Sequence, residues 1–190
     1  AESGGVVRGL KVDGFGEVAR SFIDSTLTPL VIEHGAKGLA FMYVTEEGVK
    51  AQIAKFFTDE QLKQIVAHFE AKPGDIIFFG ADKAKVVNEA IGALRIKVAE
   101  DLGQVKDCWA PLWVVDFPMF EQDKEGNVTS VHHPFTAPSC TPEELQAKPL
   151  AALSRAYDMV LNGTELGGGS IRINQSQMRS CHFTIVCFEF

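Results

Sequence analysis

Two neighbouring histidines are the first residues in this sequence whose types could do chemistry. His132 and His133 stand side by side ahead of Pro134. Successive side chains of a strand point to opposite faces, so this pair is poorly suited to binding one zinc ion. Imidazoles in such a position can contact a ligand or simply form hydrogen bonds within a loop. The spacing alone leaves both interpretations open.

An acid and an arginine on either side of a glycine run form the second candidate. Glu165 precedes Gly167–Gly169, and Arg172 follows them. If the two charged residues lie on neighbouring antiparallel strands, Arg172 offers a bidentate fork for a carboxylate, and Glu165 offers a ligand for Mg²⁺ or an ammonium group. A cross-strand ion pair is the structural alternative. The glycines could let a nucleotide approach the backbone, but the spacing is not that of a P-loop.

Composition limits the classes of function. The 190 residues are 46% hydrophobic and 23% charged, which is typical of a globular protein with one domain or two small ones. A net charge of −7 gives no general attraction for nucleic acid. No apolar stretch approaches the roughly 20 residues of a membrane span, so no membrane partner is expected. Four cysteines without a CxxC pair favour a reducing, cytoplasmic compartment.

The first half of the chain has the pattern of an α+β unit that ends near residue 104. Its beginning has neither an initiator Met nor a signal-peptide pattern, which predicts an interior point of a longer chain. The capping-box pattern from Thr58 to Gln61 predicts the start of a helix, and Gly103 predicts the end of another. We expect strands at 6–12, 38–44 and 76–79, and helices at 15–30 (disrupted near Pro29), from 58 onward and at 86–102.

The second half has more strand patterns than helix patterns. A strand at 112–117 and another through Thr129 are expected to form an antiparallel hairpin. Thr141, followed by Pro142 and two acids, predicts a helix start. Asn162-Gly163 predicts a turn, and the glycine run is expected to precede a strand at 170–173.

Several short motifs follow one another along the chain. They are Phe78-Phe79-Gly80-Ala81-Asp82, Ala93-Leu94-Arg95, Trp113-Val114-Val115-Asp116-Phe117-Pro118, His132-His133-Pro134-Phe135-Thr136-Ala137-Pro138, Tyr157-Asp158-Met159-Val160-Leu161-Asn162-Gly163 and Glu165-Leu166-Gly167-Gly168-Gly169-Ser170-Ile171-Arg172-Ile173. Their order resembles bacterial-type aspartyl-tRNA synthetase from near the N-terminus to about residue 173. Residues 1–104 resemble the GAD insertion domain of that family, and residues 105–190 resemble part of its class II catalytic domain, with 174–190 divergent. The resemblance implies an α+β fold in which the GAD-type domain precedes part of an antiparallel catalytic sheet.

The resemblance also implies an activity and roles for particular residues. The family activates L-aspartate with ATP to aspartyl-adenylate and transfers the aspartyl group to tRNA, a step of protein biosynthesis. His132, His133 and Arg172 match aspartate-binding positions, and Glu165 matches an ATP-binding acid that acts through Mg²⁺. The implied partners are L-aspartate, ATP and tRNA-Asp, with tRNA-Asn left open, and the parent enzyme is expected to be a homodimer.

Several parts of the family are not found in these 190 residues. They are the anticodon-binding OB-fold, the arginine region of motif 2 and the glycine-rich motif 3, so we expect an inactive fragment of a larger ligase. Asn174 stands where the family has a histidine, which suggests a frameshift, a cloning junction or a divergent terminus. The alternative is a standalone GAD-type interaction module without catalysis. A subunit of the tRNA-dependent amidotransferase shares only the first half.

Overall fold

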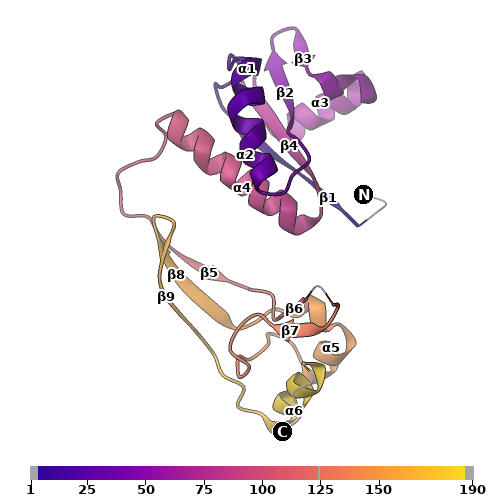
Figure 1. Ribbon diagram of the computed structural model, residues 1–190, viewed down its shortest axis with the longest axis vertical. Coiled ribbons are helices and arrows are strands. Elements are labelled where there is room, and N and C mark those ends of the chain that lie inside the picture. Colours follow the sequence, from indigo (N-terminus) through magenta and orange to yellow (C-terminus); the bar gives the residue numbers. More distant parts are fainter. Residues whose placement is uncertain (1–3, 124, 187–190) are drawn as a thin grey trace. The chain divides into compact units, whose positions relative to one another are not determined.

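The computed structural model describes residues 4–123 and 125–186, and the chain divides into two compact units (Figure 1). The first unit is Ala1–Lys106 and the second is Asp107–Phe190, a boundary close to the division expected near residue 104. Each unit has its own cluster of buried apolar side chains. Within the described residues, no helix combines the length and apolar character needed to cross a membrane.

The first unit is built on an antiparallel sheet with the strand order β1-β4-β2-β3. These strands are β1 (Val6–Val12), β2 (Ala40–Thr45), β3 (Gly48–Lys50) and β4 (Ile76–Asp82). Side chains alternate between the two faces of a strand, so the central strand β4 contributes apolar residues to both. Ile76, Ile77 and Phe78 are fully buried.

Helices cover both faces of this sheet (Figure 1). On one face lie α1 (Arg20–Phe22), the π-helical η1 (Ile23–Leu27), α2 (Thr28–Glu33) and α4 (Ala84–Asp101), which share a core with β1 and β4. The short 3₁₀ helix η2 (Gln52–Phe56) leads into α3 (Asp59–His68), on the other face. The ring of Phe69, which follows α3, lies 5.8 Å from that of Phe79.

Local signals placed two helix ends correctly. Thr58 and Gln61 form the expected capping box, with the Gln61 N–H donating to Thr58 Oγ1 over 3.3 Å. Gly103 adopts a φ of +61° just after α4, as a helix-ending glycine does. The helical run continues past Pro29 to Glu33, so the expected helix end near residue 30 is wrong. The regular α-helical pattern is nevertheless disrupted beside Pro29, since Ile23–Leu27 directly before this turn is π-helical.

The second unit combines two small antiparallel sheets with helices. The first sheet has the order β5-β8-β9, from β5 (Pro111–Val115), β8 (Ala156–Leu161) and β9 (Thr164–Ser170). The second pairs β6 (Phe120–Gln122) with β7 (Val128–Ser130). The helices are α5 (Pro142–Ala147), the 3₁₀ helix η3 (Pro149–Ala151) and α6 (Ser176–Ile185).

The expected hairpin between 112–117 and the strand through Thr129 is wrong. β5 pairs with β8, and the polar turn instead connects β6 to β7. Asp123 organises that turn, since its Oδ1 accepts from the backbone N–H groups of Glu125 and Asn127. The turn signal was correctly recognised, but it belonged to the short strands beside it.

The divergent end of the chain forms a packed helix where it is described. α6 buries Met178, Cys181 and Phe183, and two of these join the core of the second unit. Burial raises the pKa of the Cys181 thiol. Residues 187–190 of the expected divergent terminus lie outside the described residues.

Candidate functional site

A tight turn sets the register of the strands that carry the candidate residues. Asn162 and Gly163 have φ values of +49° and +82° and form the expected two-residue connection between β8 and β9. The Asn162 side chain accepts from the Ala110 N–H over 2.9 Å and donates to the Cys108 carbonyl over 2.8 Å. The turn is therefore fastened to the segment that precedes β5.

A bulge in β9 brings Glu165 and Arg172 to one face. Val160 pairs with Glu165, but Met159 pairs with Gly167, so Leu166 is an extra residue in the ladder. In a regular strand a separation of seven residues would place the two charged side chains on opposite faces. Because Leu166 shifts the alternation of side chains by one residue, Glu165 and Arg172 point to the same face of the strand.

The expectation that these two residues lie on neighbouring strands is wrong. Glu165 belongs to β9, and Arg172 lies just beyond the end of the same strand. An extended segment of this length separates the two Cα atoms by about 20 Å, which rules out the ion pair considered from the sequence. Both side chains are exposed, so they mark two ends of one face.

The glycine run lies inside β9, not in a turn ahead of a strand as expected. A Cβ atom on Gly168 would overlap Oδ1 of Asp158 and lie 2.9 Å from the Tyr157 carbonyl oxygen. Gly168 therefore leaves room for the Asp158 carboxylate, which register places on the face shared by Glu165 and Arg172. Asp158 was not predicted as a site residue, although counting back from the Asn162-Gly163 turn sets it opposite the glycines.

Backbone pairing holds the segment after the two histidines beside Arg172. Thr136 and Arg172 form an antiparallel bridge, flanked by two hydrogen bonds of 2.8 Å between residues 135–137 and 171–173. Thr136 is fully buried, and its Oγ1 lies 3.2 Å from the Ser170 Oγ. The structure thus brings the histidine segment to the Arg172 end of the face, away from Glu165.

The two imidazoles have different roles. Nδ1 of the exposed His133 accepts from the Phe135 N–H over 3.1 Å, so this ring closes a turn and carries its proton on Nε2 when neutral. The half-buried His132 ring lies edge-on to Phe117 at 5.0 Å, and its Nε2 is buried without a hydrogen-bond partner among the described residues. A ligand would reach this atom only after the ring or its surroundings moved.

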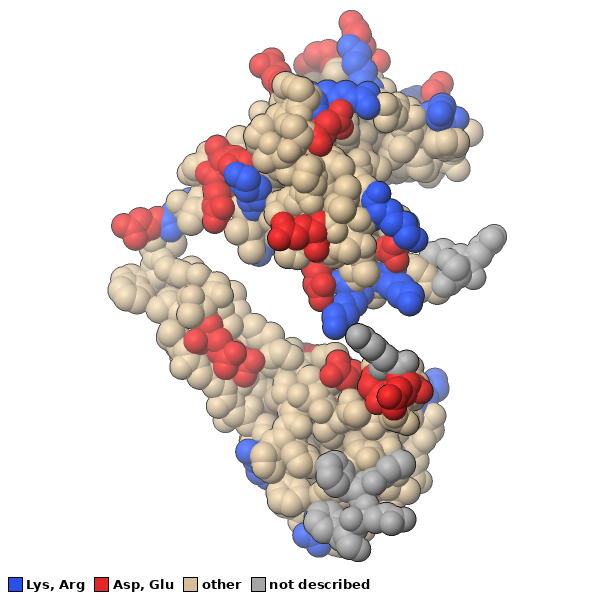
Figure 2. Space-filling model, in the orientation of Figure 1, with Lys and Arg blue, Asp and Glu red and all other residues tan. Residues whose placement is uncertain are grey.

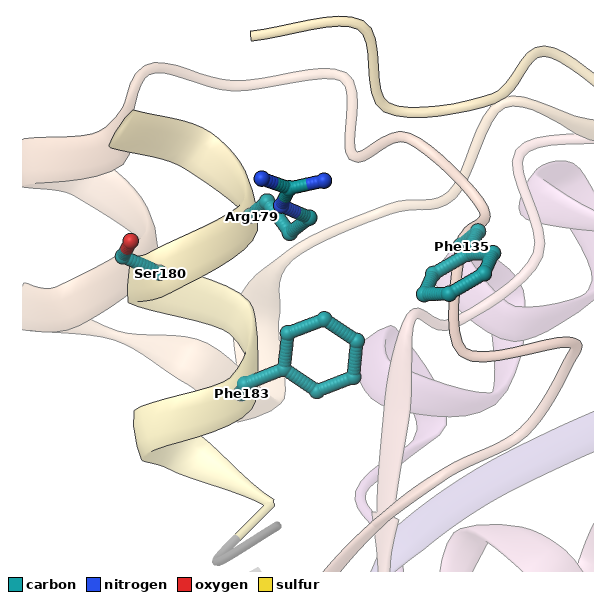
Figure 3. Close-up of a pocket in the computed structure, with 4 residues that line it drawn as sticks. All are labelled: Phe135, Arg179, Ser180 and Phe183. Carbon is teal, nitrogen blue, oxygen red and sulfur yellow. The ribbon is translucent and has the colours of Figure 1, made fainter. Parts of the chain in front are cut away.

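A cavity of about 410 Å³ lies between the histidine segment and α6. Figure 3 shows Arg179 and Phe183 projecting from α6 toward Phe135. The two phenylalanine rings are perpendicular, with centroids 5.8 Å apart. Our sequence analysis missed this cavity, because the helix that forms one wall carries no motif.

The acidic side chains fit a metal ion that a nucleotide helps to bind. Among residues 4–123 and 125–186, no group of three or more His, Cys, Asp and Glu side chains could hold a metal. Mg²⁺ needs only one or two carboxylates when phosphate oxygens complete its shell. Asp158 and Glu165 can supply those carboxylates from one face.

Comparison with known protein families finds a match to the GAD domain over residues 1–91. The matched residues run from the N-terminal strand into α4 and include all four strands of the first sheet. They lie within the first unit, whereas the candidate residues lie in the second. The chain therefore contains a GAD domain, a module associated with class II aminoacyl-tRNA synthetases.

Proposed function

We propose that the chain is part of an aspartate–tRNA ligase, in which the second unit supplies a portion of the class II catalytic domain. That enzyme joins L-aspartate to ATP as aspartyl-adenylate, releases pyrophosphate, and transfers the aspartyl group to tRNA-Asp. The observation that carries the proposal is the bulged hairpin, which aligns Glu165 and Arg172 on one face in a chain that also has a GAD domain.

Arg172 would select the substrate by its side-chain carboxylate. A guanidinium group forms two parallel hydrogen bonds with a carboxylate, and an amide such as that of asparagine cannot supply the matching charge. The buried Nε2 of His132 would add a polar contact once substrate binding exposes it. His133, whose ring closes the turn before Phe135, would keep the segment in position.

Glu165 and Asp158 would bind ATP through Mg²⁺ at the other end of the face. Bound Mg²⁺ would neutralise phosphate charge as pyrophosphate leaves. In this arrangement aspartate would lie near Arg172, and the phosphates would lie nearer Glu165. Between the two ends, the Asp158 carboxylate lies over Gly168, where a Cβ atom would overlap it.

The isolated chain is expected to be inactive, because the arginine regions of motifs 2 and 3 are not among its 190 residues. We place the parent in the cytoplasm as a homodimer. In this proposal the candidate residues bind aspartate and ATP. Other parts of the enzyme then determine whether it charges tRNA-Asp alone or tRNA-Asn too.

A standalone GAD-type module is the second candidate, and the family match supports it because that match stays within the first unit. The first unit has 13 Lys and Arg and 15 Asp and Glu residues. Figure 2 shows both signs interspersed over it. Such a surface favours contacts with protein over unaided binding of RNA.

Reading the coding DNA on both sides of this segment, in all three frames beyond codon 173, separates the two candidates. The ligase proposal predicts an upstream OB-fold and arginine motif and a downstream glycine-rich motif with an arginine, in frame or after one shift. An initiator codon just upstream and a stop after Phe190, with no synthetase sequence beyond, would refute it and favour the module.

A further inference from the structure

An open groove of about 670 Å³ runs along α3 in the first unit, between this helix and the β2–β3 hairpin. Val44 and Val49 line it from the hairpin, and Leu62 and Val66 line it from the helix. The groove follows α3 from Asp59 to just past its last turn, a length of about 16 Å for three helical turns. These four side chains give the groove an apolar floor.

The apolar side of α3 is only partly covered by the sheet. None of the helix's residues is buried, whereas α4 on the opposite face buries four. Leu62, Ile65 and Val66 all stay partly exposed. An amphipathic helix is stabilised mainly by burial of its apolar face, so α3 retains surface for a further partner.

The rim of the groove is acidic. Its carboxylates are Glu46, Glu47, Asp59 and Glu70, and its only described cation is Lys63. Glu47 is paired with Lys50 over 3.1 Å. The other three carboxylates take part in no salt bridge among the described residues. Lys11 Nζ also lies 3.5 Å from the Glu70 carbonyl oxygen. Four carboxylates therefore leave an excess of negative charge at the rim, around an apolar floor.

The negative charge of the rim limits the kinds of partner that the groove can bind. Phosphate groups of RNA would be repelled by the rim, and a second copy of the chain carries a net charge of −7. We propose that the groove binds an amphipathic helix of another protein. Its apolar side chains would enter between Leu62 and Val49, and its Lys or Arg residues would reach the free carboxylates. This inference does not depend on the ligase assignment.

The test uses the full 190-residue chain and a labelled helical peptide of about 18 residues, with Leu at helical spacing and Lys elsewhere. A twin peptide replaces every Lys with Glu. Fluorescence anisotropy is expected to show binding of the Lys peptide, at least about tenfold weaker binding of the Glu twin, and weakening at about 0.5 M salt.

Matched variants locate the binding site. The double change Glu46→Gln and Glu70→Gln is expected to weaken binding of the Lys peptide about fivefold. The control, Glu33→Gln with Glu89→Gln, removes two exposed charges from α2 and α4 and is expected to change the affinity less than about twofold.

Three results would overturn the proposal: no binding of the Lys peptide, equal affinity for both peptides, or equal effects of the two double variants. Direct binding of a labelled RNA to the wild type, lost in Leu62→Asn, would assign the groove to RNA and would also overturn the proposal. Leu62→Asn is an independent test. Loss of apolar contacts in the floor should weaken binding of the peptide even at high salt. Circular dichroism of each variant checks the fold.

Discussion

At Gly168 the absence of a side chain determines where a carboxylate can lie. We expect Gly168→Ala to lower the free energy of unfolding of the second unit by about 1–3 kcal/mol, since its Cβ would meet Asp158 and the Tyr157 carbonyl. Gly167→Ala is the matched control, because nothing lies within 4 Å of that Cβ. Urea unfolding can be followed by the fluorescence of Trp109 and Trp113, both in the second unit. Equal stability of the two variants would contradict the packing described for Gly168.

Glu70 occupies a backbone conformation that suits glycine. Its φ is +49°, and it ends α3 with hydrogen bonds from the Glu70 N–H to the Ala67 carbonyl and from the Ala71 N–H to the Val66 carbonyl. Glu70→Gly is expected to raise the free energy of unfolding of the first unit by about 1 kcal/mol, whereas Glu70→Ala removes the charge and keeps the strain. Urea unfolding followed by circular dichroism compares them. If the glycine variant is no more stable than the alanine variant, the backbone at Glu70 is not strained.

Helix α6 contains a titratable group in the core of the second unit. His182 is fully buried, its Nε2 lies 3.1 Å from the Ser130 Oγ, and its Nδ1 has no partner in the part of the chain that the structure describes. Burial lowers the pKa of His182 below its ordinary value of 6.5. The unfolded chain therefore takes up a proton first as the pH falls, and stability present above about pH 6.5 is lost below it.

The measurement is the urea midpoint of the second unit as a function of pH. His182→Gln, which cannot titrate, is expected to flatten the decline on the acid side. His133→Gln, a change at an exposed ring, should preserve it. An unchanged slope in the His182 variant would show that another group controls the acid sensitivity.

Elements defined by neighbouring residues could be predicted, and those defined by distant pairing could not. The capping boxes at Thr58 and Thr141 were found because each lies within four consecutive residues. The partner of β5 could not be found, because β8 lies more than 40 residues along the chain. Strand register depends on such contacts and on turn geometry.

The same distinction applies to the candidate site. The residue types pointed to a carboxylate-binding arginine and a metal-binding acid, and these roles remain proposals. The bulge at Leu166 was not visible in the sequence, and it alone sets Glu165 and Arg172 on one face. Asp158 was overlooked because its relation to Gly168 is a cross-strand one. The residue types indicated which groups the side chains could bind. Their relative positions depend on the pairing of β8 with β9, which the sequence did not show.

For the whole molecule, the division into two units predicts a preferred site of proteolysis. Lys106 is exposed in the segment between α4 and β5, where no helix or strand is formed. Limited digestion with trypsin is expected to cut there first and release residues 1–106 with their helical circular dichroism retained. Lys106→Gln should delay this cut. Early cleavage within α4, after Lys85, Arg95 or Lys97, seen by mass spectrometry, would contradict the assignment of two compact units.

Aspartate-dependent pyrophosphate exchange by the full-length protein that contains this chain tests the ligase proposal most directly. We expect exchange with L-aspartate but not with L-asparagine, and a loss of about a hundredfold or more in Arg172→Leu. Arg155→Leu is the control, because Arg155 is exposed and lies across from Ile171, on the opposite face from Arg172. Near-normal exchange in Arg172→Leu, or no aspartate-dependent exchange in the wild type, would contradict the account.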